Sequence, residues 1–139
     1  MFLSTQRTMV LGFTQDVPYL LPLNYGFLPG TTGVFYFHGA LSGKKIELMG
    51  KGVQASFVVY QEGLVITGPS ACDWGMNYSS VMGEGYLEIV SDPEEKKKGL
   101  DCLMAQFQAP IPYGYDEKVF LRTQVFKLTI NNLTAKDKH

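Results

Sequence analysis

Apolar residues recur along this chain in short runs that are separated by glycine, proline and polar residues. Many of these runs are rich in aromatic and β-branched side chains, and runs of this kind between turn residues are typical of β-strands. We therefore predict strands over residues 8–13, 18–27, 34–38, 55–60 with a short continuation over 64–67, 78–90 and 119–130. A turn, two loops and a polar tail are predicted over residues 61–63, 68–77, 109–117 and 134–139.

Three of the predicted strands carry a more specific pattern. Pro22 has no N–H group to donate, so the second strand is expected at a sheet edge or at a bulge. In the strand over 78–90, Val81 and Leu87 share one face with two glycines, which indicate a bulge or the close approach of another group. In the last strand the expected core face consists of Phe126, Leu128 and Ile130. The first three strands are predicted to form an antiparallel meander.

A helix is predicted directly after the fifth strand. Asp92 is expected to cap it, Pro93 to occupy its first position and Glu95 to complete a capping box. Apolar residues at i, i+3, i+4 and i+7 then form one stripe, which consists of Leu100, Leu103, Met104 and Phe107. This spacing predicts a helix that packs one face against the sheet.

The overall composition narrows the class of protein. The chain has 139 residues and a net charge of −1. This length predicts one domain over residues 1–139, and the charge lacks the basic footprint of a nucleic-acid-binding protein. No apolar run approaches the roughly 20 residues of a membrane-spanning helix. Short strands with few helices predict a mainly β fold, either a sandwich or a small closed barrel that leaves no exposed strand edges.

The two cysteines, Cys72 and Cys102, match no zinc-binding spacing and no CxxC redox pair. Free thiols are typical of a reducing compartment, and Cys72 is expected to be a small buried residue rather than a reactive thiol. The N-terminus lacks the charged start, the apolar run and the cleavage site of a signal peptide. These features predict a cytoplasmic protein.

A short helix over 43–49 begins with an unusual charge. Ser42 is its expected cap, and Lys44 and Lys45 occupy its first turn. Cations are unfavourable there because the N-terminal end of a helix is positive. A bound anion such as a phosphate group would explain both lysines, since free N–H groups at a helix start attract anions. The alternative is that both are ordinary solvated lysines.

Several single residues allow two interpretations. His38 ends an aromatic strand, where it either faces a cofactor or satisfies a buried backbone group. Tyr25 and Tyr78 either contact a planar ligand or belong to the core. Trp74 fills either a cleft or a dimer interface. The sequence contains no Ser-His-Asp arrangement, metal-binding cluster, dinucleotide fingerprint or phosphate-binding Walker loop.

Three motifs, in this order, carry a resemblance to a known family: Pro22-Leu23-Asn24-Tyr25, then Phe37-His38-Gly39-Ala40 with Gly43-Lys44-Lys45, then Tyr78-x-Ser80-Val81 ahead of the helix that starts at Asp92. With them the chain resembles the flavin-binding split-barrel proteins related to pyridoxamine 5'-phosphate oxidase, and within these the Nim-type nitroimidazole-resistance proteins. The resemblance extends from about Thr8 to Lys136. It implies a six-stranded antiparallel Greek-key split barrel that forms a homodimer and binds flavin mononucleotide (FMN) at the subunit interface.

The resemblance also implies three groups of cofactor-binding residues. The first holds the FMN phosphate and lines its approach: His38, Gly39, Ala40, Ser42, Lys44 and Lys45. The second follows the isoalloxazine ring through strand backbone: Leu23, Asn24 and Tyr25. The third faces the same cleft from this or the partner subunit: Ser79, Ser80 and Val81. His38 is in addition the candidate catalytic proton donor. The chain departs from the family pattern at Ser79, where a larger or basic residue is usual.

The implied function is flavin-dependent reduction of a small electrophile, such as a nitroaromatic compound in nitroimidazole resistance. The alternative is a non-catalytic protein of the same fold that binds or stores flavin, haem or a deazaflavin, with His38 as the candidate haem ligand. A third possibility is a barrel that has lost its cofactor. We expect a small-molecule substrate and no metal, nucleic-acid or membrane partner.

Overall fold

The computed structural model describes residues 2–39 and 43–138. Within these residues the strands form one antiparallel sheet in the order β2-β1-β5-β6-β7-β4-β3. The strands are β1 (Thr8–Phe13), β2 (Tyr19–Asn24), β3 (Gly26–Leu28), β4 (Val34–Gly39), β5 (Val53–Ile66), β6 (Gly75–Val90) and β7 (Gln124–Lys138). The predicted mainly β fold is confirmed, and the described residues contain seven strands where six were predicted.

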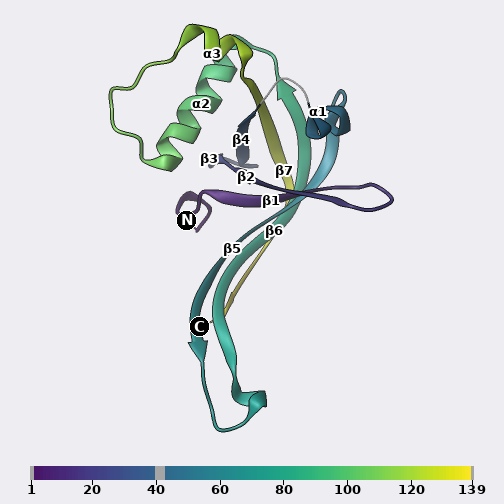
Figure 1. Ribbon diagram of the computed structural model, residues 1–139, viewed down its shortest axis with the longest axis vertical. Helices are drawn as coiled ribbons and strands as arrows, with labels where there is room; N and C mark the ends of the chain where they lie inside the picture. The colour runs from purple at the N-terminus through teal and green to yellow at the C-terminus, as the bar shows by residue number, and fades with distance from the viewer. Residues whose placement is uncertain (1, 40–42, 139) are drawn as a thin grey trace.

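The helices occupy one end of the molecule. They are α1 (Lys44–Met49), α2 (Pro93–Phe107) and α3 (Glu117–Arg122). Two short 3-10 turns lie elsewhere: η1 (Phe2–Ser4) precedes β1, and η2 (Ala71–Asp73) connects β5 to β6. Figure 1 shows α2 and α3 together on one side of this end, with α1 on the other side. None of the helices in residues 2–39 and 43–138 is both long and apolar enough to cross a membrane.

The strand predicted over 18–27 is split at Tyr25, and this split curls the sheet. Its first part, β2, pairs with β1, whereas its second part, β3, pairs with β4 at the opposite sheet edge. Tyr25 lies fully buried between them, and its hydroxyl donates to the Leu3 carbonyl at 2.7 Å. Its ring meets Phe35 edge-on, with 5.0 Å between centroids. One continuous segment thereby connects both edges of the sheet.

The pairings of the predicted meander are confirmed. The segment predicted as the second strand pairs antiparallel with β1 through β2 and with β4 through β3, and β4 also pairs with β7, which is distant in sequence. Pro22 lies in β2, an outer strand of the sheet, so its predicted edge position is confirmed.

The barrel interior is filled by large apolar side chains from most of the strands. Its fully buried members include Met9, Leu11, Tyr25, Phe35, Phe37, Val59, Leu87, Phe126 and Leu128. The predicted core faces of β6 and β7 are confirmed, because Val81, Leu87, Phe126, Leu128 and Ile130 are all buried. A second cluster packs the predicted stripe of α2 against the outside of the sheet, with Leu103 fully buried at its centre.

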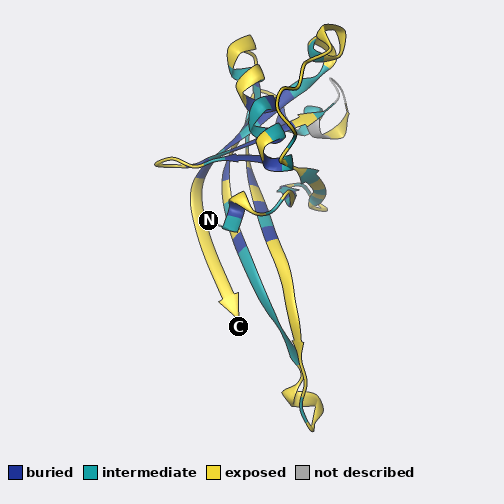
Figure 2. Cartoon of the chain, turned by 90° about the vertical axis from the view of Figure 1, so that its left-hand side faces the viewer, coloured by how far each residue is buried: buried dark blue, intermediate teal, exposed yellow. Residues whose placement is uncertain are grey.

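The sheet extends beyond the barrel as a long arm, defined here as residues 60–80 and 131–138 (Figure 1). Residues 60–66 of β5 and 131–138 of β7 are exposed throughout, as the yellow strands in Figure 2 show. The predicted turn at 61–63 and the predicted polar tail are wrong, because both segments are strands. Within the arm, β6 and β7 pair without a register shift as far as Tyr78 opposite Lys138. Main-chain hydrogen bonds therefore hold the end of β7 in the sheet, although its sequence does not alternate between apolar and polar residues.

The glycines of β6 mark a close approach, as predicted. The pairing of β6 with β7 shifts register between Glu84 and Gly85. A Cβ atom on Gly83 would lie 2.2 Å from the Asn132 carbonyl oxygen, and one on Gly85 would lie 2.3 Å from that of Thr129. These two strands therefore cross more closely than any side chain at either glycine would allow.

The start of α2 agrees with the prediction in part. The Asp92 side chain accepts from the Glu95 N–H at 3.0 Å, and Pro93 is the first helical residue. The Glu95 carboxylate does not complete a capping box; it accepts from the Tyr36 hydroxyl and the Lys127 ammonium, each at 3.0 Å. Partial burial raises the pKa of Glu95. The hydrogen bonds from Lys127 and Tyr36 lower this pKa by more than burial raises it, so the pKa of Glu95 lies below its usual value.

The region after α2 differs from the prediction. Asp116 caps α3 by accepting from the Val119 N–H at 3.1 Å, so residues 117–122 are helical and β7 begins only at Gln124. The predicted strand start at Val119 is therefore wrong. A local side-chain cap at Asp116 competes successfully with the strand tendency of the apolar residues that follow.

Gln106 of α2 ties the helix to the barrel. It is 9% exposed, and its side-chain oxygen accepts from the Phe27 N–H at 3.0 Å. Its amide group donates to the carbonyls of Leu3 at 2.9 Å and Gln6 at 2.6 Å. Close packing adds to this tie, because a Cβ atom on Gly26 would lie 2.6 Å from the backbone of α2.

We expect Gln106→Leu to lower the free energy of unfolding by about 3 kcal/mol. The substitution keeps the side-chain volume but removes hydrogen bonds worth about 1 kcal/mol each and leaves the buried Phe27 N–H unpaired. Urea unfolding followed by circular dichroism measures the change. The same substitution at the exposed Gln54 is the control, and we expect it to stay within about 0.5 kcal/mol of the original chain. Equal effects at both positions would contradict this role for Gln106.

Candidate functional site

The predicted phosphate-binding lysines lie at the start of α1. Lys44 and Lys45 are its first two residues, and Gly43, rather than the predicted Ser42, occupies the N-cap position without a side-chain cap. The Lys44 ammonium lies 4.6 Å from the centroid of the Tyr19 ring at the beginning of β2. Ala40 and Ser42, which belong to the same predicted group, lie outside the described residues. Of the first group, Lys44 therefore contacts the outer strand β2.

The predicted ring-binding residues differ from one another in exposure. Leu23 packs against the core, and Tyr25 is fully buried, so neither side chain faces a ligand. Burial raises the pKa of the Tyr25 hydroxyl. Asn24 is exposed, and its amide donates to the Arg7 carbonyl at 3.3 Å and to the Thr8 hydroxyl at 3.2 Å. Of this group, Asn24 alone presents its side chain at the surface.

The backbone of β2 offers hydrogen-bonding groups along its outer edge. In an antiparallel strand, alternate residues direct their N–H and C=O groups to opposite sides. Pro22 has no N–H, and the Tyr25 N–H donates to the Arg7 carbonyl at 3.1 Å, so the odd-numbered residues pair with β1. The N–H groups of Leu20 and Asn24 therefore point to the open edge of β2. The Tyr25 backbone, which the resemblance implied follows the flavin ring, already uses its N–H within the chain.

A shallow hollow of about 410 Å³ crosses β2, β1 and β5 on the outer face of the sheet. Pro22, Val10, Val58 and Tyr60 give it apolar walls. Residues directly opposite in a ladder point to the same face, and Asn24 pairs with Thr8, which also lines the hollow. The hollow is therefore a shallow, mainly apolar depression with the amide of Asn24 at its border.

The third predicted group lines one cavity, although its side chains alternate between the two faces of β6. Ser80 is paired with Tyr60 and so belongs to the face of the hollow. Val81 is buried, and the Ser79 hydroxyl donates to Asp137 beside a separate cavity of about 230 Å³. Lys44 lies over Tyr19, on the opposite face of β2 from Pro22. One chain thus brings Asn24 and Ser80 to one face but does not unite all three groups in one cavity.

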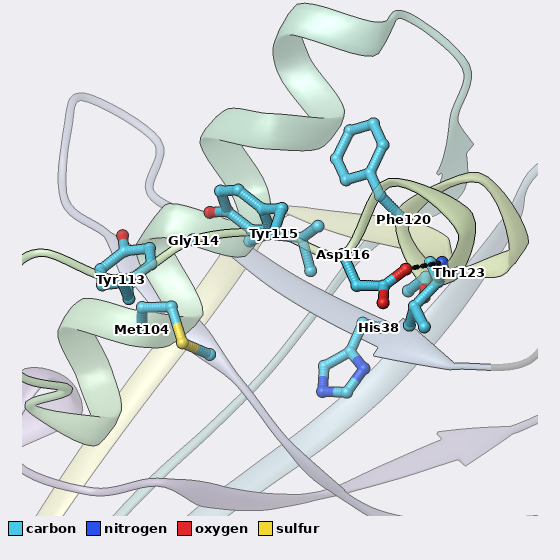
Figure 3. A pocket seen from close by; sticks show the side chains of 10 residues that line it. His38, Met104, Tyr113, Gly114, Tyr115, Asp116, Phe120 and Thr123 are labelled. Carbon is cyan, nitrogen blue, oxygen red and sulfur yellow. Dashed lines mark hydrogen bonds between the residues drawn. The ribbon is translucent and has the colours of Figure 1, made fainter.

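His38 is exposed at the end of β4 and borders a cavity of about 280 Å³ under α2 and α3 (Figure 3). Tyr113 and Tyr115 form one wall of it. Sequence reasoning placed these tyrosines in a loop without a role. The available signal was the pair of tyrosines at i and i+2 near an acidic helix residue, Asp101, but the sequence does not show that they meet.

The cysteines do not form a site. Cys72 is exposed in η2 at the tip of the arm, so its predicted burial is wrong. Cys102 is half-buried in α2, and this burial raises the pKa of its thiol. Both are free thiols. Across residues 2–39 and 43–138, no three His, Cys, Asp or Glu side chains gather closely enough to hold a metal ion.

Comparison with solved structures places the fold. Flavocytochrome Anf3 from Azotobacter vinelandii matches with 23% identity and a TM-score of 0.77, over 99% of this chain and 64% of that protein. A Bacteroides thetaiotaomicron protein assigned to 5-nitroimidazole antibiotic resistance matches with 23% identity and a TM-score of 0.73, over 96% of this chain and 78% of that one. A FAD- and haem-binding protein from Mycobacterium smegmatis matches with 20% identity and a TM-score of 0.82, over 99% and 68%.

These identities establish a shared fold, and this chain spans just under two thirds of the length of Anf3. No match was found among curated proteins. The sequence model of a protein family described as pyridoxamine 5'-phosphate oxidase matches residues 1–137, which is nearly the entire chain. The split-barrel sheet with its split strand at Tyr25 agrees with this match. The chain therefore belongs to the pyridoxamine 5'-phosphate oxidase family.

Proposed function

We propose that this protein binds FMN and uses it to reduce a small electrophile, with a nitroaromatic compound as the substrate class. The observation that carries the proposal is the contact of the Lys44 ammonium with the Tyr19 ring at the beginning of β2, the outer strand whose Leu20 and Asn24 N–H groups face the open edge. A cation at this edge suits a phosphate, and backbone donors suit the polar edge of a flavin ring. The neighbour assigned to 5-nitroimidazole resistance supports the substrate class.

The proposed phosphate site consists of Lys44 and Lys45 with Ser42, approached past Gly39 and Ala40. Lysine binds phosphate as a point charge, and two adjacent lysines balance the two negative charges of a phosphate monoester. The Lys44 ammonium at 4.6 Å from the Tyr19 ring keeps its charge at the surface, where an incoming anion can reach it. Sequence position puts both lysines in the first turn of α1, where they would be least favourable without such an anion.

The proposed ring site follows the open edge of β2 and the adjacent apolar hollow. The N–H groups of Leu20 and Asn24 point to that edge, while Pro22 and Val58 give the hollow a flat apolar surface. The flavin supplies hydride and electron transfer when bound. The chain contributes orientation through these groups, and His38 contributes a proton, since an imidazole changes charge near neutral pH.

We further propose that the functional unit is a homodimer formed by the arm. Large apolar side chains are exposed along the arm: Tyr60 (60%), Leu64 (78%), Val65 (61%), Trp74 (57%) and Leu133 (44%). Large exposed apolar side chains gathered on one part of a protein mark an interaction site. A second copy on the arm would also bring its Ser79, Ser80 and Val81 near the flavin site, which one chain leaves incomplete.

The alternative function within this fold is haem binding without catalysis. Two of the neighbours are a flavocytochrome and a protein that binds FAD and haem. One observation favours this alternative in the present chain: His38, a residue type that ligates haem iron, borders an apolar cavity. The same cavity is lined by Met104 and Leu100, which suit a large apolar ligand.

The ultraviolet–visible spectrum of the purified protein separates these functions. We expect two flavin bands, and FMN in the supernatant after heat denaturation. FMN rather than riboflavin is expected because the proposed lysine site binds the phosphate group that riboflavin lacks. Reduction of the bound flavin, followed by reoxidation with a nitroaromatic compound, then tests the substrate class. A Soret band without flavin would support the haem alternative. A colourless protein that does not take up added FMN would overturn the proposal.

A further inference from the structure

A cavity of about 280 Å³ lies between α2, α3 and the segment that connects them (Figure 3). Leu100 and Met104 of α2 form one wall. Val119 and Phe120 of α3 form another. The connecting segment contributes two tyrosines to the lining, so nearly all of the lining is apolar or aromatic. Small-molecule sites in proteins typically have such walls with a few polar groups among them.

The two tyrosines are held in place from outside the cavity. The Asp101 carboxylate on α2 accepts from the Tyr113 hydroxyl at 2.9 Å and from the Tyr115 hydroxyl. The hydrogen bond from Tyr115 lowers the pKa of Asp101 most, so the carboxylate stays ionised at neutral pH. Because both hydroxyls are bonded to Asp101, the tyrosines present their rings, rather than their polar ends, to the cavity. We name this arrangement the tyrosine latch.

The rings form an aromatic corner. Tyr113 and Tyr115 meet edge-on, with centroids 5.9 Å apart and planes at 85°. Tyr115 meets Phe120 in a similar way, at 5.8 Å and 65°. Edge-to-face pairs of this kind leave a ring face available for a further aromatic ring to stack on. The thioether of Met104 borders the same space, and sulfur makes favourable contacts with aromatic rings.

Several polar groups at the cavity are satisfied within the chain. The Asp116 carboxylate accepts from the Val119 N–H at 3.1 Å, and the Thr123 hydroxyl donates to the Val119 carbonyl at 2.7 Å. His38 borders the cavity from the end of β4 and places an imidazole beside the apolar walls. A mainly aromatic ligand therefore suits this cavity.

We propose that this cavity binds a planar, uncharged aromatic molecule, stacked in the aromatic corner and closed in by the tyrosine latch. Its walls come from α2, α3 and the segment 113–116, whereas the proposed flavin site lies at β2 and α1. The two sites share only His38. The proposal does not require bound flavin, because every group that forms the cavity belongs to the chain itself.

The test uses N-phenyl-1-naphthylamine, a neutral aromatic probe whose fluorescence rises in apolar surroundings. Val119 lines the cavity and is 50% exposed, so Val119→Trp fills the space without disturbing the core. We expect this variant to weaken probe binding at least tenfold. The matched control is Leu121→Trp, on the same helix but outside the lining and 70% exposed, which should bind the probe as the original chain does. Exciting the probe at a wavelength longer than tryptophan absorbs avoids interference from the new side chain.

A second variant tests the latch independently. Asp101→Ala removes the acceptor of both tyrosine hydroxyls, and we expect faster dissociation of the probe in stopped-flow measurements. Unchanged affinity in Val119→Trp, or equal losses in Val119→Trp and Leu121→Trp, would overturn the proposal. Complete displacement of the probe by FMN would also overturn it, because the probe would then occupy the flavin site. If neither variant changes the affinity of the protein for FMN, the two sites are separate, as proposed.

Discussion

Replacing Lys44 and Lys45 together by alanine is expected to weaken FMN binding at least a hundredfold. Hydrogen bonds to charged groups contribute about 1.5–3 kcal/mol each, so losing two of them costs about 3 kcal/mol or more, and each 1.4 kcal/mol is a factor of ten. The fold should be unaffected, because Lys44 lies at the surface and the first turn of α1 loses two charges that are unfavourable there. Isothermal titration calorimetry of the flavin-free protein measures the change.

Riboflavin makes this experiment sharper because it has the same ring but no phosphate. The double variant should bind riboflavin as well as the original chain does, while losing its preference for FMN. The control is another adjacent pair of lysines, Lys97 and Lys98, which are exposed in α2 and whose replacement should leave FMN binding unchanged. An unaltered FMN affinity in the double variant would show that Lys44 and Lys45 are ordinary surface lysines. Loss of riboflavin as well as FMN would indicate structural damage.

The parts of the fold that sequence reasoning predicted are those with local causes. The start of α2 depends on Asp92 and Pro93, which act within a few residues of the helix start. The core face of β7 follows from strict alternation at Phe126 and Leu128, which fixes the side of the sheet to which each residue points. The glycines of β6 predicted a close approach because only a missing side chain permits one.

The errors in the fold have distant causes. Tyr25 splits a continuous apolar run because its hydroxyl donates to the Leu3 carbonyl and its ring packs against Phe35. Neither contact can be predicted from the pattern of neighbouring residues. The polar end of β7 becomes a strand because β6 pairs with it as far as Lys138. A polar sequence carries no periodic signal for such pairing, so it was read as a tail.

The candidate site shows the same division. Lys44 and Lys45 were recognisable because their charge conflicts with their place at a helix start, and this conflict is local. Exposure along β2 was not predictable, since it depends on where the sheet edge lies: Asn24 is exposed, while Leu23 and Tyr25 turn inward. The cavity beside His38 depends on contacts between α2 and the segment after it, so it could not be predicted from the pattern of neighbouring residues.

The second large effect concerns the arm. We expect Leu64→Lys to raise the dissociation constant of the homodimer at least a hundredfold. Leu64 is 78% exposed in the single chain, and burying a leucine is worth about 1.5–3 kcal/mol, which counts twice in a symmetric dimer. A buried lysine adds the cost of removing its charge from water. Sedimentation equilibrium at micromolar concentration measures the change.

Val17→Lys provides the matched control. Val17 is 81% exposed, but it lies in the turn between β1 and β2, away from the arm. The same change of residue type at similar exposure should leave the dimer intact. A Leu64→Lys protein that remains as dimeric as the original would show that the arm is not the interface, and the exposed apolar side chains would then need another partner.

The two predictions together test how the flavin site is completed. Replacing Lys44 and Lys45 should remove FMN from a protein that remains dimeric, because their contacts are to the phosphate and not to the arm. Leu64→Lys should remove both the dimer and the FMN, because in the proposed arrangement the partner subunit completes the flavin site. A Leu64→Lys monomer that retains FMN at the original affinity would place the complete flavin site within one chain and separate cofactor binding from dimerisation.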